Sequence, residues 1–358
     1  MTDTPDQAAL RAVVRDFCAR HASSAGQLAD GMTTASVWKR LASELGLTGL
    51  AIGERHGGMG AGLAEVAVAA QELGRVLLPV PYLSTAIAGA VLGEGSPELA
   101  ARMLPSLATG AVTAAFALDG EIVAWDIPAQ VHGPGSSWLP GQGLAAGEAL
   151  VSGQARHVLD GAEAGLFLAR SRAGPLYAVR AVDAVVEPAG TLDQSRSQAT
   201  VTFRHAPALA TGADARRAVS LLRAALAAES AAAAQRCLEL TVGYLTTRRQ
   251  FGQPIGSFQA LRHRCADLAV EVTAARATAA AAIAAGPAEL EVTAALAKLY
   301  CADVFWHAAA EMIQLHGGIG FTWEHEAHRY LKRAKTTQLL LGTQGELRAL
   351  IGDLAGLR

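Results

Sequence analysis

The sequence predicts an α+β protein in which an N-terminal helical domain, a middle β-barrel or β-sandwich domain and a C-terminal four-helix bundle follow one another. Three observations support this order: helical spacing of apolar residues early in the chain, short β-rich pieces after them, and long Ala-rich stretches towards the end. A chain of 358 residues also exceeds the usual size of a single core. We place the domain boundaries at 1–110, 111–210 and 211–358.

The N-terminal domain is predicted to consist of amphipathic helices. Leu10, Val14 and Phe17 recur at a spacing that places them on one helical face. A second helix is predicted over 34–45, and Gly46 supplies the residue that ends it.

A glycine-rich stretch separates this second helix from the next one. Five glycines within 53–62 suggest a phosphate-binding loop. A dinucleotide loop, however, requires the spacing G-x-G-x-x-G directly after a strand, whereas here a helix precedes and the spacing differs. We interpret the stretch as a tight turn between helices, with the nucleotide loop as the alternative.

The middle domain is predicted from its short strands, which Gly, Pro or Asp residues separate. Several short strands at such spacing favour a small barrel or sandwich. The predicted strands are 112–118, 149–151, 166–169, 176–179, 182–186 and 199–203, with a loop-like insert at 128–147.

The C-terminal domain is predicted to contain very long helices over 215–247, 256–285 and 288–315. Alanine-rich helices pack their backbones closely, which suits a tight bundle.

Composition excludes several classes of function. The net charge is -2 and the sequence contains no basic stripe, so nothing in it indicates a nucleic-acid-binding surface. No apolar run is long enough to cross a membrane, and the first residues lack the basic and apolar regions of a signal peptide. The four cysteines are widely spaced without a CxxC motif, which indicates reduced, buried thiols in a cytoplasmic protein.

Two segments late in the chain carry the strongest functional signal. They are 248–255 (RRQFGQPI) and 314–321 (QLHGGIGF), and each follows a predicted long helix. Both combine a polar side chain with glycines, which let the main chain approach a ligand closely. As an ordered pair, within a helix–β–helix layout over nearly the whole chain, they resemble the C-terminal domain of acyl-CoA dehydrogenases.

The resemblance implies FAD bound across a dimer interface. In the family, the arginine equivalent to Arg248 meets the pyrophosphate of an FAD held mainly by the neighbouring subunit, because a guanidinium donates two parallel charged hydrogen bonds. The equivalent of Phe251 packs near the adenine; a helix-capping arginine and a core phenylalanine are the alternatives. The residues that the resemblance assigns to the cofactor are Arg248, Phe251, Gln314, Gly317, Gly318 and Thr343.

The catalytic base of the family is absent from both of its usual positions. In most members it is the glutamate of an E-G-T loop, a carboxylate whose pKa a dry site raises. Here Leu341 occupies that position, and Leu222 occupies the alternative position on the first long C-terminal helix. The neighbouring Arg223 is expected to contact the acyl-CoA substrate, with a helix-surface arginine as the alternative.

Two carboxylates remain as candidates for a displaced base, Glu346 and Glu229, although both are ordinary helix residues by default. The T-E-P-x-x-G-S-D-like loop that touches the flavin in the family is also missing from the first strand. By contrast, 191–196 (TLDQSR), a later β-domain feature of many actinobacterial members, is present.

Three histidines near the C-terminus need a separate interpretation. His325 and His328 lie three residues apart without an HExxH motif, so we expect a helix start and no metal. His316, beside Gly317, is interpreted as structural because this position varies in the family.

The lost base and the retained FAD segments together resemble the base-lacking subunit of heteromeric actinobacterial steroid acyl-CoA dehydrogenases. This implies an α2β2 complex with a second acyl-CoA dehydrogenase-like subunit, acting on an acyl-CoA thioester, with a steroid side-chain thioester as one candidate. Electron-transfer flavoprotein is the implied electron acceptor. A self-sufficient homo-oligomer with a displaced base and a non-redox acyl-CoA-binding or scaffolding subunit remain as alternatives.

Overall fold

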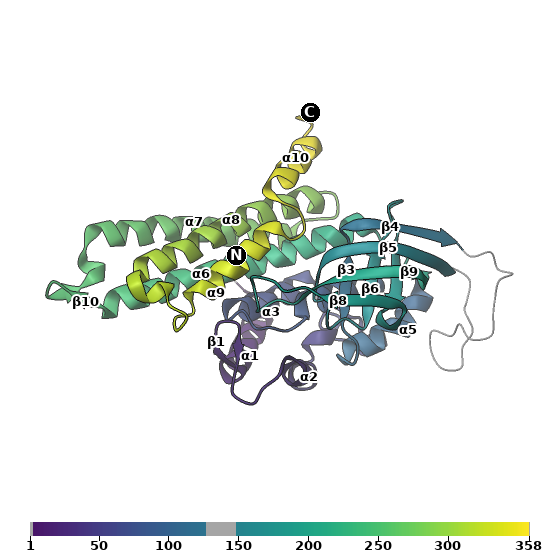
Figure 1. Cartoon of the computed structure of the whole chain (residues 1–358), viewed down its shortest axis with the longest axis horizontal. Coiled ribbons are helices and arrows are strands. Elements are labelled where there is room, and N and C mark those ends of the chain that lie inside the picture. Colours follow the sequence, from purple (N-terminus) through teal and green to yellow (C-terminus); the bar gives the residue numbers. More distant parts are fainter. Residues whose placement is uncertain (1–2, 127–147, 358) are drawn as a thin grey trace.

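A computed structural model describes residues 3–126 and 148–357 (Figure 1). Within them, helices at the N-terminal end, a curled β-sheet and long C-terminal helices follow one another, so the predicted fold class is confirmed. The insert predicted as a loop at 128–147 lies outside the described residues.

The N-terminal part is built from helices around a shared apolar core. Its helices are α1 (Pro5–His21), α2 (Thr34–Leu45), α3 (Leu63–Arg75), α4 (Tyr82–Gly93) and α5 (Pro97–Ala108). The helix predicted over 34–45 is α2, and Gly46 ends it with a left-handed φ of 64°. The glycine-rich stretch forms a turn between helices, as predicted, around the 3-10 turn Glu54–His56.

A small hairpin after α1 was not predicted. It pairs β1 (Ala22–Ser24) with β2 (Gln27–Leu28). Strands of two or three residues are too short to show an alternating pattern, which explains the omission.

The middle part is a single seven-stranded sheet in which β3, β6, β7, β9, β5 and β4 neighbour one another in that order and β8 pairs with β9. The strands are β3 (Ala114–Ala117), β4 (Gly120–Asp126), β5 (Glu148–Leu159), β6 (Leu166–Arg170), β7 (Leu176–Arg180), β8 (Ala184–Pro188) and β9 (Gln198–Ala210). Strands β3 and β4 stand at opposite ends of this order, yet only Leu118 and Asp119 separate them in the chain. The sheet therefore curls back on itself.

The strand predictions differ from the sheet at β4, β5 and β9. The first of these was not predicted, and the other two extend well beyond the predicted 149–151 and 199–203. The pairing of β5 with β9 shifts register at two places, and His157 lies at one of them with φ 53°. Such bulges break the alternation of apolar and polar residues on which the prediction depends.

The C-terminal part contains α6 (Ala215–Thr247), α7 (Gln259–Ala284), α8 (Leu290–His316), α9 (Ala327–Leu339) and α10 (Gln344–Leu354). Helix α6 has the predicted bounds, whereas α7 begins later than predicted because the 3-10 turn Ile255–Ser257 precedes it. Helix α6 packs against α3 and α4 as well as α7 and α8, so its Ala-rich middle is buried on nearly all sides. Its contacts join the N-terminal helices and the bundle into one continuous core.

The cysteines are free and buried, as predicted. Across the described part of the chain, no helix combines the length and apolar character needed to cross a membrane.

Candidate functional site

The segment between α6 and α7 forms a hairpin at one end of the bundle, marked by β10 in Figure 1. Strand β10 (Arg249–Gln250) pairs with β11 (Gln253–Pro254), and Phe251 and Gly252 form the turn. Their φ values of 52° and 78° are both left-handed, as the two central residues of a type I′ turn require.

Two side chains of this hairpin face outwards. Phe251 is 89% exposed although it is a large aromatic residue in a left-handed conformation that few non-glycine residues adopt. Arg248 is exposed as well, and its guanidinium forms no hydrogen bond or ion pair with any residue that the structure describes. Phe251 is therefore not a core residue of this chain, and both side chains are available to a ligand or another subunit.

The second segment begins where α8 ends. The main-chain N–H of Gly317 donates to the carbonyl of Gln314, and Gly317 adopts φ 62° and ψ -140°, a combination that favours glycine. No described atom lies within 4 Å of a Cβ built at Gly318. Gln314 and both glycines are exposed, and Phe321 just beyond them is 86% exposed. Main chain and apolar side chains thus face outwards here too.

A stack of rings joins the two segments. The ring of His316 lies 4.5 Å from that of Tyr244 at an interplanar angle of 25°, and 4.5 Å from the ring of His325. Tyr244 precedes Arg248 by one helical turn, and His316 directly precedes Gly317. The structure therefore places 248–252 and 314–318 at the same end of the bundle.

The loop after α9, which carries Leu341, is held by two cations. Arg223 Nε donates to the Leu341 carbonyl at 2.9 Å, and Lys298 Nζ donates to the carbonyls of Gln338 and Gly342. Burial lowers the pKa of Lys298 to about 8 and also lowers the pKa of Arg223. Leu341 itself adopts a left-handed φ of 58°. Arg223 thus supports the loop through its main chain.

The two positions at which the resemblance places the base converge on one small cavity of about 30 Å³. Leu222 and Leu341 line it together with Leu340, and Ser84 contributes a hydroxyl. A cavity of this size holds only a few water molecules. Asp119, Arg156 and His157 of the β-domain also line it, but no carboxylate of α6 or of the loop that carries Leu341 does.

Glu346 lies at the start of α10. It is exposed, and its carboxylate accepts hydrogen bonds from the main-chain N–H and the hydroxyl of Thr343, at 2.7 and 2.8 Å. These bonds lower the pKa of Glu346, whereas a base for an α-proton needs a raised pKa. Thr343 caps this helix, so both residues have a structural role here.

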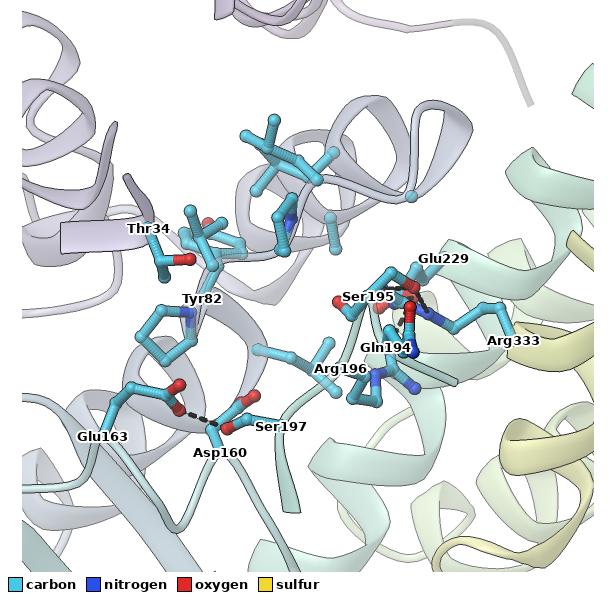
Figure 2. Close-up of a pocket in the computed structure, with 18 residues that line it drawn as sticks. Thr34, Tyr82, Asp160, Glu163, Gln194, Ser195, Arg196, Ser197, Glu229 and Arg333 are labelled. Atoms are coloured by element: carbon cyan, nitrogen blue, oxygen red, sulfur yellow. Dashed lines mark hydrogen bonds and ion pairs between the residues drawn. The ribbon is translucent and has the colours of Figure 1, made fainter. Parts of the chain in front are cut away.

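Glu229 is buried between two arginines (Figure 2). Its Oε1 accepts hydrogen bonds from Arg196 Nη2 at 2.5 Å and from Arg333 Nη1 at 2.8 Å. Arg333 also pairs with Asp193 at 2.9 Å and donates to the Ser195 carbonyl at 2.7 Å. This network attaches the 191–196 loop to α6 and α9. The environment of Glu229 is that of a structural ion pair rather than a free base.

Beside this network lies a polar cavity of about 90 Å³, at which the N-terminal helices, the sheet and the bundle meet. Asp160 lines it and accepts a hydrogen bond from Ser84 of α4 at 2.8 Å. Burial raises the pKa of Asp160 to about 6. Sequence reasoning missed this junction because its members lie far apart in the chain. The available signal was a lone Glu229 inside an Ala-rich helix.

Comparisons with known families agree with this geometry. Residues 4–111 match the family described as "Acyl-CoA dehydrogenase, N-terminal domain", and residues 213–355 match "Acyl-CoA dehydrogenase, C-terminal domain".

Individual relatives match over almost the whole chain. The chain is 36% identical over 360 residues to "Acyl-CoA dehydrogenase IpdE2" of Mycobacterium tuberculosis, covering 99% of both proteins. Its structure is similar to that of one chain in the ChsE4-ChsE5 complex from the same organism, with a TM-score of 0.83 and 28% identity, covering 99% of this chain and 98% of that chain. A variant of the Tcur3481-Tcur3483 steroid ACAD gives a TM-score of 0.82 at 25% identity, covering 98% of each chain.

Proposed function

This chain belongs to the acyl-CoA dehydrogenase family, whose members are oxidoreductases acting on acyl-CoA thioesters, and we propose that it is the base-lacking subunit of a heteromeric member. Its partner is a second acyl-CoA dehydrogenase-like subunit, and two copies of each form an α2β2 complex. The similarity to a solved complex of two different chains and to a steroid ACAD supports this assembly and a steroid side-chain acyl-CoA as the substrate class.

One observation carries the proposal. Leu222 and Leu341 occupy both positions of the family's base, and both line one small cavity of about 30 Å³. The apolar leucines cannot accept a proton. We infer that another subunit supplies the carboxylate that removes the α-proton.

The opposite end of the bundle fits the adenosine and pyrophosphate part of an FAD that the partner holds. Arg248 has a guanidinium that pairs with none of the described residues and is available to the pyrophosphate, and Phe251 presents an exposed ring for the adenine. Gln314 and the exposed main chain of Gly317 and Gly318 provide hydrogen-bonding groups beside them. Thr343 caps α10 and lies in the loop after α9, away from these cofactor-facing groups. We propose that it supports the FAD site only indirectly.

FAD, when bound, supplies the acceptor for the β-hydrogen, which leaves the substrate as hydride. The partner's carboxylate takes the α-proton, so that the Cα–H and Cβ–H bonds break and a carbon–carbon double bond forms. The role of this chain is to hold the cofactor from its adenosine side and to exclude water from the interface. We propose Arg223 as a residue near the mouth of the acyl site, and electron-transfer flavoprotein as the acceptor of the electrons.

Co-expression with an acyl-CoA dehydrogenase-like subunit that keeps its E-G-T glutamate tests the assignment. We expect acyl-CoA dehydrogenation by the mixed complex, loss of turnover when the partner's glutamate becomes glutamine, and unchanged turnover with Glu346→Gln in this chain. Turnover by this chain alone, as a homo-oligomer with bound FAD, would overturn the proposal.

A further inference from the structure

The ring stack behind the two outward-facing segments involves three parts of the chain. Tyr244 lies on α6, His316 at the end of α8, and His325 in the segment that leads to α9. His316 is 4% exposed, and both flanking rings lie 4.5 Å from it. Offset ring contacts of this kind contribute beyond their buried area. Through Tyr244 and His316 the stack connects the end of α6 with the end of α8, two helices that also pack along their length.

The side chain of His316 is fixed in orientation as well as position. Its Nδ1 lies 2.6 Å from the carbonyl of Met312, and because a carbonyl accepts, Nδ1 donates. Burial lowers the pKa of His316; the hydrogen bond with the Met312 carbonyl and the nearby Glu326 oppose this effect, and His325 adds to it. The phenol of Tyr244 is the titratable group that faces it from α6. The geometry therefore assigns His316 the role of a buried ring of fixed orientation between Tyr244 and His325.

We propose that His316 is a positioning residue that holds the hairpin of Arg248 and Phe251 and the Gly317–Gly318 main chain at a fixed separation, so that both meet one FAD. This inference rests on the proposed function, since it concerns the same cofactor. His316 acts through Tyr244 and through the main chain that follows it, and needs no contact with the cofactor.

Three single variants of the co-expressed complex test this role, with the dissociation constant for FAD as the readout. His316→Ala removes the ring and is expected to weaken FAD binding roughly two- to tenfold. His316→Phe keeps a neutral ring in the stack and is expected to restore binding close to the unchanged chain. His307→Ala is the matched control, because His307 also lies on α8 but is half exposed and pairs with Glu271.

A double-mutant cycle with Tyr244→Leu adds a second readout. Because both side chains act through one contact, the losses caused by His316→Ala and Tyr244→Leu should not add. Additive losses, or His316→Phe binding FAD as weakly as His316→Ala, would overturn the inference.

The FAD-binding measurements also distinguish a failure of the His316 positioning role from a failure of the proposed function. A mixed complex that binds no FAD in any variant contradicts the proposed function. FAD binding that is equal in the unchanged chain and in His316→Ala leaves the proposed function intact and contradicts the positioning role.

Discussion

Arg223 Nε donates a 2.9 Å hydrogen bond to the main-chain carbonyl of Leu341. Leu341 occupies the usual position of the family's base, and Arg223 lies on α6 beside Leu222, which occupies the alternative position. The hydrogen bond therefore connects the two positions at which the base is missing. Lys298 donates to the Gly342 carbonyl of the same loop and to the Gln338 carbonyl in the last turn of α9. The loop is thus a supported structural element of the chain, with a leucine where catalysis would need a carboxylate.

Replacing Arg223 should loosen this loop. Arg223→Met removes the donor and leaves the Leu341 carbonyl without that partner, so we expect a loss of about 1–3 kcal/mol in the free energy of unfolding. Arg217→Met on the same helix is the control, because Arg217 forms an exposed pair with Glu94 and such pairs contribute at most about 1 kcal/mol. Chemical denaturation of both variants measures the difference, and equal losses would contradict a specific support of the loop by Arg223.

Restoring the glutamate alone should not restore activity. Leu341→Glu places a carboxylate beside a small cavity of about 30 Å³, but the first strand of the sheet still lacks the family's loop that touches the flavin. We expect no acyl-CoA dehydrogenation by the purified variant chain with added FAD and an artificial electron acceptor. Turnover above that of the unchanged chain would show that the site lacks only its base.

The arginine that links the loop at 191–196 to the bundle should be essential for stability. Arg333→Met leaves the buried carboxylates of Glu229 and Asp193 without this partner, and breaking a buried pair in this way costs about 3–5 kcal/mol. Arg236→Met serves as control, since Arg236 pairs weakly with Glu239 at 3.8 Å near the surface. A melting temperature of Arg333→Met equal to that of the control would show that the network contributes little.

Asp160 should make stability fall as pH rises. Burial raises its pKa from 3.8 to about 6, so the folded state binds this proton more tightly than the unfolded state. The contribution of this proton to the free energy of unfolding is therefore fully present below pH about 4 and is lost as pH rises through about 6. The total loss is on the order of 3 kcal/mol. Asp160→Asn should remove this component of the pH profile, whereas Asp16→Asn at an exposed position should not. An unchanged profile in Asp160→Asn would contradict the assignment.

Arg248 and Phe251 should matter for the cofactor and little for the fold. Arg248→Ala removes charged hydrogen bonds to a pyrophosphate, which corresponds to roughly ten- to hundredfold weaker FAD binding by the mixed complex. Phe251→Ala should weaken binding less, and both should leave the melting temperature of the isolated chain unchanged because both side chains are exposed. Arg262→Ala, an exposed arginine at the start of α7, is the control. Unaltered FAD binding in Arg248→Ala would remove this residue from the cofactor site.

The sequence predicted the helices better than the sheet, for a physical reason. Helix α6 matched its prediction at both ends because Ala-rich composition and the turn after Thr247 are local signals. Strand β5 was predicted only in part, because its bulges at Val151/Gly153 and Ala155/Val158 interrupt the alternation of side chains.

The candidate site likewise contains parts that the sequence predicts and parts that it does not. The outward-facing segments were found from the sequence because each is a contiguous motif with glycines. Other contacts join residues more than seventy positions apart in the chain, namely the ring stack of Tyr244 with His316 and the ion pair of Glu229 with Arg333. No local sequence pattern predicts contacts of this kind. The sequence therefore shows neither the contact of His316 with Tyr244 nor the arginine partners that make Glu229 an unsuitable base.

The most direct test of the central claim is the ratio of FAD to chain, together with the native mass, for this protein alone and co-purified with a base-bearing partner. The account predicts about one FAD for every two chains in a mixed tetramer and no stable FAD in the protein alone. One FAD per chain in a homo-oligomer would contradict it, because that result requires copies of this chain to complete the flavin site for one another.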